Sequence, residues 1–386
     1  MRLGRRASIR SHRAKRRKIV APWIVATTVT VVVATALTTG YSFLLRPACR
    51  GSVTATIAAA PNVATHLQDL ARSWADDQPT VGGKCASVEV ESKDSATVAT
   101  ALGGTWQTKT DGPAPDVWVP DSTVWVRKAT LNPTIAAMVP QKQPSIARTL
   151  SVIAMPRPMA EALGWPRTEL SWQSLINDVA GNGWERFDKP EWGAFRVGMP
   201  DPNTSTAALL ALMAISGADG DTPAAPEGLA AVDRLKQIRT PCGSTTDQIL
   251  TDLARADRAG EEAVLQYLSA FPALETDVLS YNRGNPNVPL VAVYPTTGTA
   301  DADNPYLVLN ADWSRSAQQK VAQEFLTYLR GETGRAAFLD TGYRDANRVP
   351  GRGLTEENGV SPKVLALPRT VLLPEMVEDA VRSWAA

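Results

Sequence analysis

The sequence has 386 residues, and its 40 Lys and Arg nearly balance its 39 Asp and Glu, for a formal net charge of +1. The balance hides an asymmetry, because nine basic residues lie before Ile19 and Arg46 and Arg50 add two more, which leaves 29 basic against 39 acidic residues from Gly51 onward. This acidic region is not suited to nucleic acid or anionic lipid, and about 335 residues are enough for two lobes or domains.

The first 45 residues predict a membrane anchor. A basic segment at 1–18 holds nine Lys and Arg and no acid, and an uncharged apolar run of 27 residues follows at 19–45. Such a run forms a helix of about 40 Å, which crosses a hydrocarbon core of about 30 Å with some tilt. By the positive-inside rule, residues 1–18 are cytoplasmic and the chain after Arg46 is extracytoplasmic.

Three other interpretations of this segment stay open. Residues 34–36, Ala-Thr-Ala, suit a signal-peptide cleavage site, although the uncharged run continues beyond them. Cys49 could be a lipoprotein cysteine, but the Arg-Pro-Ala in front of it does not resemble a lipobox. The basic cluster could bind nucleic acid, but the adjoining apolar run accounts for its charge. The sequence favours an uncleaved signal anchor.

From Gly51 onward, short apolar runs alternate with segments of helical periodicity, which indicates an α/β fold with parallel strands. Strands are expected at 53–58, 87–91, 116–119, 150–154, 195–199, 289–294 and 306–309. Helices are expected at 63–74, 96–102, 124–129, 171–176, 207–215, 229–238, 247–256, 261–268, 276–281 and 317–329.

The three cysteines allow one disulfide and one free thiol. Cys49 and Cys85 each precede a predicted strand, and the starts of two adjacent parallel strands lie within bridging distance. An extracytoplasmic compartment permits the bond. We therefore expect Cys49 to pair with Cys85 and Cys242 to be free.

The sequence contains no catalytic pattern. Its two histidines, His12 and His66, are too few for a His-based triad or a multi-His metal site outside the membrane. It also lacks a Gly-rich phosphate loop, paired-cysteine zinc spacing and an EF-hand pattern. We expect no enzyme activity, no metal and no cofactor.

Several motifs resemble those of bacterial extracellular solute-binding proteins, from about residue 53 to the C-terminal end. They are Pro-Asp-Val-Trp-Val-Pro at 115–120, Ile-Ala-Met-Pro at 153–156 with Ala-Leu-Gly-Trp-Pro at 162–166 and Ser-Trp at 171–172, Val-Tyr-Pro-Thr-Thr-Gly-Thr at 293–299 with Asn-Pro-Tyr at 304–306, and the closing segments 322–329 and 334–344.

The resemblance implies a two-lobe type II periplasmic-binding-protein-like fold, preceded by one N-terminal transmembrane helix. One lobe would contain residues 51–153 plus 290–386, the other residues 156–288, and the ligand would lie between them. The resemblance is nearest to a membrane-anchored actinobacterial type that is often fused to a von Willebrand factor type A domain. We expect that domain and its Asp-x-Ser-x-Ser metal-adhesion motif to be absent here.

The candidate ligand-binding residues follow or end predicted strands, at the sheet edge where helices begin. Helix N-termini favour small polar or anionic solutes. The same residue types are also common N-caps, and nearby Asp94, Asp121 and Asp201 oppose a bare oxyanion. The six candidates are Asn62, Ser95, Ser122, Thr204, Ser205 and Tyr294.

Tryptophans offer a different kind of site, an aromatic platform for a sugar or a cation, although core packing explains at least Trp118 and Trp172. The others considered are Trp125, Trp165, Trp184 and Trp192.

Together these features predict a membrane-anchored, extracytoplasmic solute-binding-like protein that closes two lobes over a small polar or anionic ligand. Its partners would be that solute, the membrane and an ABC permease or another envelope protein, with no nucleic acid. The alternative is a cell-envelope interaction or adhesion-type module that retains the fold without binding a ligand.

Overall fold

The computed structural model describes residues 49–167, 169–179, 183–217, 225–298, 300–363 and 374–385. Residues 51–386 form one compact unit, and residues 1–50 form another, of which only Cys49 and Arg50 are described. The predicted cytoplasmic tail at 1–18 and the predicted membrane helix at 19–45 lie outside the described residues. Within the described residues, no helix combines the length and the apolar character needed to cross a membrane.

A five-stranded sheet forms the first part of the folded unit, in the order β11-β4-β1-β3-β2. Its centre is parallel and consists of β1 (Ser52–Ala59), β3 (Lys84–Ser92) and β4 (Val117–Val119). The edge strands β2 (Thr80–Val81) and β11 (Leu307–Val308) are antiparallel to β3 and β4. The central strands lie where the apolar runs predicted them, and the mixed α/β character is confirmed.

The cysteines pair as the sequence predicts. Cys49 and Cys85 are disulfide-bonded, and Cys242 is free. Cys85 lies opposite Ser52 in the register of β1 and β3, so the residue at the start of β3 is beside the start of β1. Closing this 37-residue loop stabilises the folded chain by about 3 to 4 kcal/mol in the chain-entropy model.

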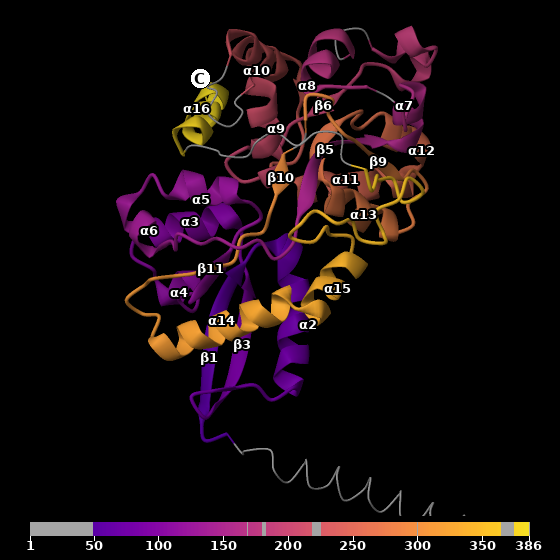
Figure 1. Ribbon diagram of the computed structural model, residues 1–386. Helices are drawn as coiled ribbons and strands as arrows, with labels where there is room; N and C mark the ends of the chain where they lie inside the picture. The colour runs from indigo at the N-terminus through magenta and orange to yellow at the C-terminus, as the bar shows by residue number, and fades with distance from the viewer. Residues whose placement is uncertain are drawn as a thin grey trace, which may run out of the picture. The chain divides into compact units, whose positions relative to one another are not determined.

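Helices pack on the first sheet (Figure 1). Those that follow its parallel strands are α2 (Pro61–Asp76), α3 (Ser95–Gly103) and α5 (Thr123–Ala129). α14 (Ser316–Arg330) packs against β1 and α2, with the ring centroids of Trp74 and Phe325 5.3 Å apart. α2 and α14 are amphipathic, and each buries its apolar face against the sheet. Smaller helices of this part are α4 (Thr108–Asp111), α6 (Pro133–Met138) and α15 (Glu332–Asp340).

A second sheet is built around β5 (Thr149–Pro156), which is buried along its whole length. β5 pairs antiparallel with β8 (Phe271–Leu274), β9 (Leu290–Val293) and β10 (Asp301–Ala302). The sequence predicted β5 and β9 but not β8, whose short apolar run contains Pro272. A proline is tolerated there because β8 is an edge strand.

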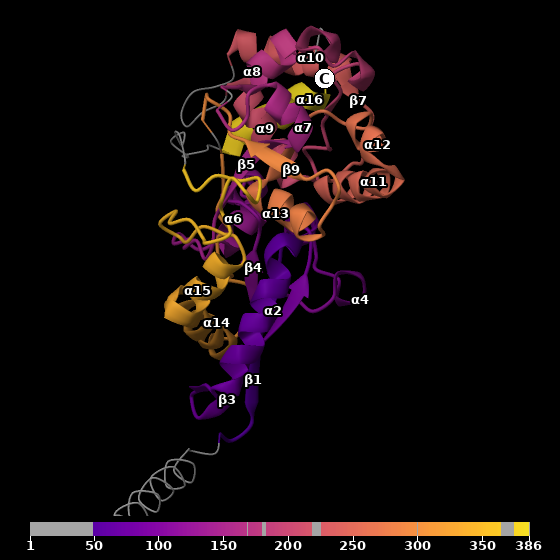
Figure 2. The same cartoon turned by 90° about the vertical axis from the view of Figure 1, so that its right-hand side faces the viewer.

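The chain between β5 and β9 is mainly helical. α11 lies beside α12 and α13 (Figure 2). The α-helices are α7 (Arg157–Ala162), α8 (Trp172–Ser174), α9 (Thr206–Ser216), α10 (Pro226–Ile238), α11 (Thr246–Ala259), α12 (Glu261–Leu265) and α13 (Glu275–Arg283). The other elements are a π-helix (Leu175–Val179), two 3₁₀ helices (Trp184–Phe187 and Pro190–Trp192) and the parallel strands β6 (Val197–Gly198) and β7 (Arg239–Thr240).

Two expected elements differ in form. The helix expected at 171–176 begins as α8 and continues as the π-helix, and the strand expected at 195–199 is reduced to β6. β6 pairs in parallel with β7, which also has two residues. The predicted tryptophan burial is confirmed for Trp118 and Trp172, which are 0% and 1% exposed.

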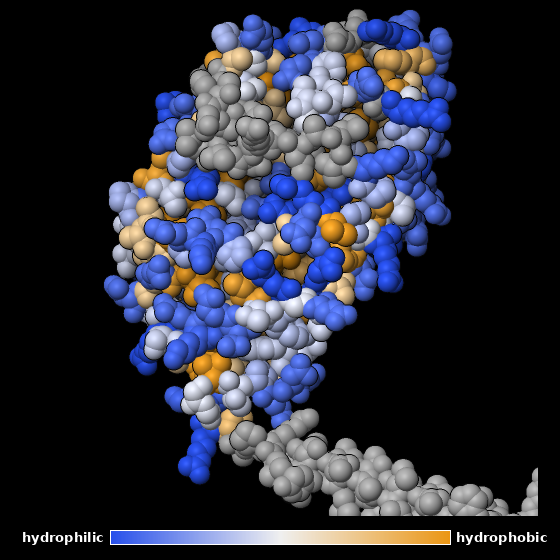
Figure 3. All heavy atoms as spheres, viewed as in Figure 1, coloured by the Kyte–Doolittle hydropathy of each residue, from blue (hydrophilic) through white to orange (hydrophobic). Residues whose placement is uncertain are grey.

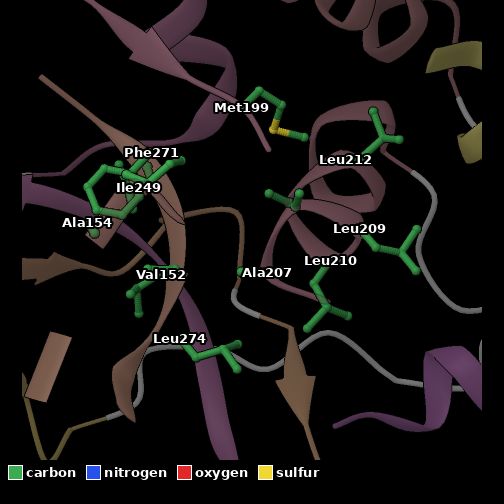
Figure 4. Packing of buried hydrophobic residues seen from close by; sticks show 14 of the residues in the cluster. Val152, Ala154, Met199, Ala207, Leu209, Leu210, Leu212, Ile249, Phe271 and Leu274 are labelled. Atoms are coloured by element: carbon green, nitrogen blue, oxygen red, sulfur yellow. The ribbon is translucent and has the colours of Figure 1, made fainter. Parts of the chain in front are cut away.

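α9 is the central helix of the larger core. Ten of its 11 residues are buried, so it contacts the protein on every side rather than along one stripe. Figure 4 shows Leu209, Leu210 and Leu212 pointing in different directions from this helix, with Val152 of β5 and Leu274 of β8 among the surrounding core residues. The beginning of α9 is therefore held firmly by the packing of the rest of the helix.

The division into two lobes stays a prediction, because residues from 51 onward form one compact unit. The C-terminal helix α16 (Pro374–Ala385), which the prediction assigns to the first lobe, packs against α5 and also against α9 and α10. Its buried residues include Val377 and Ala380. α16 thus joins elements from both predicted lobes.

Candidate functional site

A cavity of about 430 Å³ lies where several helices begin. The first turns of α2, α9, α11 and α13 contribute to its wall, and so does the turn after β4. Its volume is within the range of sites for small molecules. Polar residues of the wall include Asn62, His66, Asp94, Asp121, Thr204, Ser205, Thr206, Thr246, Asp247, Thr276, Asp277, Arg283 and Tyr343.

Side chains in the wall also cap the helices that begin there. Ser205 Oγ accepts a hydrogen bond from the backbone N of Ala208 (3.3 Å), which caps α9, and lies 3.0 Å from Thr246 Oγ1 of α11. Asp94 Oδ1 caps α3 by accepting from the backbone N of Thr97 (3.0 Å). Capping fixes these polar groups at the cavity, because each helix start must satisfy its free N–H groups.

Asp121 joins the turn after β4 to the start of α9. Its Oδ2 accepts hydrogen bonds from Ser95 Oγ (2.8 Å) and from Thr206 Oγ1 (2.9 Å). Thr206 Oγ1 in turn accepts from Trp125 Nε1 (2.7 Å). One side of the cavity is therefore closed by a chain of hydrogen bonds between segments that are far apart in sequence.

Two wall carboxyl groups have raised pKa values. Burial raises the pKa of Asp121 to about 6, against the opposing effect of the Ser95 and Thr206 hydrogen bonds. Burial, with a further contribution from the charges of Asp247 and Asp121, raises the pKa of Asp277 to about 7. Loss of hydration and neighbouring negative charge both favour a protonated carboxyl.

The wall offers little positive charge. Burial, and after it the charge of Arg283, lower the pKa of His66, which keeps this imidazole neutral near pH 7. The ring of His66 makes an edge contact with Tyr343, at 5.7 Å between centroids. Arg283 is held at the wall by a hydrogen bond from Nη2 to the backbone O of Thr341 (2.7 Å).

Some polar atoms of the wall are buried without a partner in the described part of the chain. They are both amide atoms of Asn62 and the hydroxyl of Thr276. Buried polar groups are nearly always hydrogen-bonded. Polar groups of this kind at a cavity wall can be satisfied by a bound solute or by water.

The structure brings three of the six predicted residues to this cavity, Asn62, Thr204 and Ser205. Ser95 is buried directly behind the wall, where its hydroxyl holds Asp121. The predicted positions of the turn after β1 and of the turn before α9 therefore agree with the structure. Whether these residues bind a ligand stays a prediction.

Ser122 does not reach the cavity. It is buried, caps α5 by accepting from the backbone N of Val124 (3.3 Å), and donates to the backbone O of Asp301 (3.2 Å). The neighbouring Thr123 donates to both carboxylate oxygens of Asp303, at 2.6 Å each. The turn after β4 thus points its hydroxyls at the crossing segment around β10, and only Asp121 faces the cavity.

The placement of Tyr294 in the same cavity is also wrong. Its hydroxyl donates to Glu275 Oε1 (2.7 Å), and it lines a separate cavity of about 440 Å³ with Trp165 and Ser361. The reason is a buried ion pair between Glu275 and Arg344, which draws the phenol toward the interior.

Sequence reasoning missed the wall residues of α11, of α13 and of the turn after α15, where Thr341 and Tyr343 line the cavity. Thr245 and Thr246 precede the helix expected at 247–256, and Asp247 begins it, with the same N-cap pattern as the candidates, so the signal was present. Thr276 and Asp277 begin the helix expected at 276–281, but the strand before it, β8, was not predicted, so this helix start was not placed at the sheet edge.

The described residues hold no further site for a metal ion. In the described ranges, no group of three or more His, Cys, Asp or Glu could hold a metal ion. The expectation that the Asp-x-Ser-x-Ser spacing is absent is wrong, because residues 312–316 read Asp-Trp-Ser-Arg-Ser. They lead into α14, where Ser314 is buried. None of the six tryptophans considered as an aromatic platform lines the 430 Å³ cavity.

Residues 55–344 match the sequence family of bacterial extracellular solute-binding proteins. The chain belongs to this family. The match covers both sheets and most of the cavity wall, and the resemblance seen in the sequence motifs is confirmed. This family consists of binding proteins for small solutes.

Two curated relatives are uncharacterized proteins of Mycobacterium tuberculosis strains. Each is 25% identical over 308 residues, a match that covers 78% of this chain and 43% of the relative. The chain therefore matches less than half the length of these relatives.

Solved structures of binding proteins share the fold. The sulfate-binding protein SubI of Mycobacterium tuberculosis gives a TM-score of 0.51 at 13% identity, covering 81% of this chain and 93% of SubI. Iron-bound HitA of Pseudomonas aeruginosa gives 0.54 at 16% identity, covering 86% and 97%. AfuA of Actinobacillus pleuropneumoniae, with fructose-6-phosphate bound, gives 0.51 at 11% identity, covering 87% and 98%. These likenesses show a periplasmic-binding-protein-like α/β fold.

Proposed function

We propose that this protein binds a small polar solute in the cavity where α2, α9, α11 and α13 begin, outside the cytoplasmic membrane. The observation that carries the proposal is the convergence of several helix starts on one cavity of about 430 Å³. Asn62 and Ser205 reach it from segments more than a hundred residues apart. Polar groups from rigid elements that meet in a cavity are the usual form of a small-molecule site.

Closure of two lobes over the solute is part of the proposal. Thr206 of α9 donates to Asp121 beside the cavity, and Lys128 Nζ of α5 donates to Asn203 Oδ1 (3.1 Å) next to the same turn. These contacts join the two predicted lobes and are the kind that form on closure and break on opening. The ligands of SubI, HitA and AfuA differ in charge and size, so the shared fold itself selects no solute.

Ser205 provides a direct test of binding. Ser205→Ala should weaken solute binding by about 0.5 to 1.5 kcal/mol for a neutral partner and more for a charged one, because one hydrogen bond is lost. It should also lower stability through loss of the α9 cap. Thermal shift against a panel of oxyanions, sugars and amines identifies the solute first, since a ligand raises the melting temperature of the state it binds.

Ser171→Ala is the matched control. Ser171 caps α8 by accepting from the backbone N of Ser174 (3.0 Å), and it is not part of the cavity wall. It should reduce the melting temperature without reducing affinity. Equal affinity in the wild type and Ser205→Ala, with lowered stability, would mean that Ser205 acts only as a cap. No response to any solute would favour the interaction or adhesion-type module.

The proposed location is the outer side of the cell membrane, with the segment 19–45 as a single-pass anchor and 1–18 in the cytoplasm. The basic segment followed by the uncharged run supports this orientation. A small solute bound there could be delivered to an ABC permease, which is the partner we propose. Protease added to intact spheroplasts should digest the folded unit, and complete protection would contradict the topology.

A further inference from the structure

The wall of the cavity is rich in carboxyl groups. Asp94 and Asp121 follow strands of the first sheet, and Asp247 and Asp277 lie in the first turns of α11 and α13. Within the part of the chain that the structure describes, none of the four forms an ion pair. Arg283 is the one Arg or Lys among the lining residues.

The carboxyl groups also supply the negative charge that helix N-termini attract. Asp94 accepts from the first turn of α3 and Asp277 Oδ2 accepts from the backbone N of Leu274 at the start of α13 (2.8 Å). Asp247 lies in the first turn of α11. Each of these helix starts therefore already has a negative group of the protein beside it, which removes much of its attraction for a bound oxyanion.

A bare metal ion does not fit this arrangement. Where the structure is described, no three acidic or imidazole side chains are close enough to ligate one ion. The acids are spread around a space of about 430 Å³, which suits a small organic molecule. On the face that Figure 3 shows, hydrophilic side chains predominate among the described residues and apolar ones occur in small groups.

Hydrogen-bonding groups without partners accompany the acids. Asn62 Oδ1 and Thr276 Oγ1 are acceptors that are buried and unused, and Asn62 Nδ2 is an unused donor. An ammonium group needs several acceptors, because it carries up to three N–H donors. The wall thus holds both the negative charge and the acceptors that an ammonium group requires.

We infer that the solute is a small organic cation, whose ammonium group lies toward Asp121 and Asp277 and whose other end offers an acceptor to Arg283. This inference rests on the proposed function and names the solute class of the same cavity. It differs from the sequence-based expectation, which allowed an anion. A bare oxyanion would face carboxyl groups on both sides of the cavity and only one guanidinium.

The pKa values of the carboxyl groups in the cavity wall predict how solute binding depends on pH. The pKa values of Asp121 and Asp277 are raised to about 6 and about 7, so near pH 5.5 the latter is mostly protonated and near pH 8 both are ionised. A cation binds the ionised forms, so its affinity rises with pH, whereas an anion would show the opposite trend. The other charged or titratable groups of the wall are Asp94, Asp247, His66, Arg283 and Tyr343.

Isothermal titration with L-lysine and ethanolamine, which each carry an ammonium group and an oxygen acceptor, tests the inference, with sulfate and fructose-6-phosphate as anionic probes. At least one amine should bind, with an affinity at least about tenfold higher at pH 8 than at pH 5.5, since amine groups of this kind stay protonated over that range. Asp277→Asn should lower that affinity about tenfold or more and flatten much of the pH dependence. Its amide oxygen can still accept from Leu274, which preserves the contact at the start of α13.

Asp76→Asn is the matched control, because Asp76 is exposed at the far end of α2. It should leave amine affinity unchanged, and the melting temperatures of both variants should show that each is folded. Binding of sulfate or fructose-6-phosphate without any amine would overturn the cation inference and leave solute binding intact. Binding of none of the probes would overturn both. Equal losses in Asp277→Asn and Asp76→Asn would also contradict the assignment.

Discussion

Arg344→Met should lower the free energy of unfolding by about 3 to 5 kcal/mol, because it leaves the carboxylate of Glu275 buried without its partner. Both side chains are 0% exposed, and the guanidinium donates from Nε to Glu275 Oε2 (3.0 Å) and from Nη2 to Oε1 (2.6 Å). Methionine fills much of the volume but supplies no donor. Urea denaturation followed by circular dichroism measures the loss.

Arg335→Met is the appropriate comparison. Arg335 pairs with Asp345 at 2.7 Å, but its side chain is 52% exposed, so water compensates for much of the loss and we expect about 1 kcal/mol or less. The double variant Arg344→Met with Glu275→Leu should regain part of the stability, since no unpaired charge remains. Similar effects of Arg344→Met and Arg335→Met would show that burial does not control the strength of this pair.

The Arg344–Glu275 pair also positions the cavity wall. Glu275 is the first residue of α13, and the next two residues, Thr276 and Asp277, line the cavity. The backbone N of Leu150 donates to Glu275 Oε2 (3.0 Å), which ties the start of α13 to β5. Arg344→Met should therefore disturb the site as well as the fold, and affinities of this variant need to be measured well below its melting temperature.

Local patterns in the sequence predicted the parallel strands of the first sheet and the turns that follow them. The apolar run before Asn62 ends where a helix begins, so both the position and the polar character of this turn could be predicted from the sequence. The pairing of Cys49 with Cys85 followed from the same reasoning about strand starts. These predictions depend on contacts between neighbouring strands of one sheet.

The errors concern contacts between segments that are far apart in the sequence. Ser122 bonds to Asp301, 179 residues away, and Tyr294 bonds to Glu275, whose ion-pair partner Arg344 is 69 residues further along the chain. A turn sequence indicates that hydroxyl groups are present but does not fix which side of the turn faces solvent. Asp121 and Ser122 are adjacent, yet only the former lines the cavity.

The network around Trp125 couples stability to the site, and its removal should affect both. Trp125 is 1% exposed, packs in the core that includes α9, and donates to Thr206, which in turn holds Asp121. Trp125→Ala should cost about 3 to 5 kcal/mol of unfolding free energy through loss of packing. Trp125→Phe keeps most of the volume and should cost about 1 kcal/mol for the lost hydrogen bond.

Solute affinity distinguishes this network from ordinary core packing. Trp172 is equally buried at 1% exposed and does not line the cavity, so Trp172→Ala should destabilise the protein to a similar degree without changing affinity at temperatures where it is folded. Trp125→Phe should reduce affinity severalfold despite its small effect on stability, because Thr206 loses the donor that fixes its hydroxyl, and that hydroxyl orients Asp121. Unchanged affinity in Trp125→Phe would mean that Asp121 is held in place by Ser95 and the backbone alone.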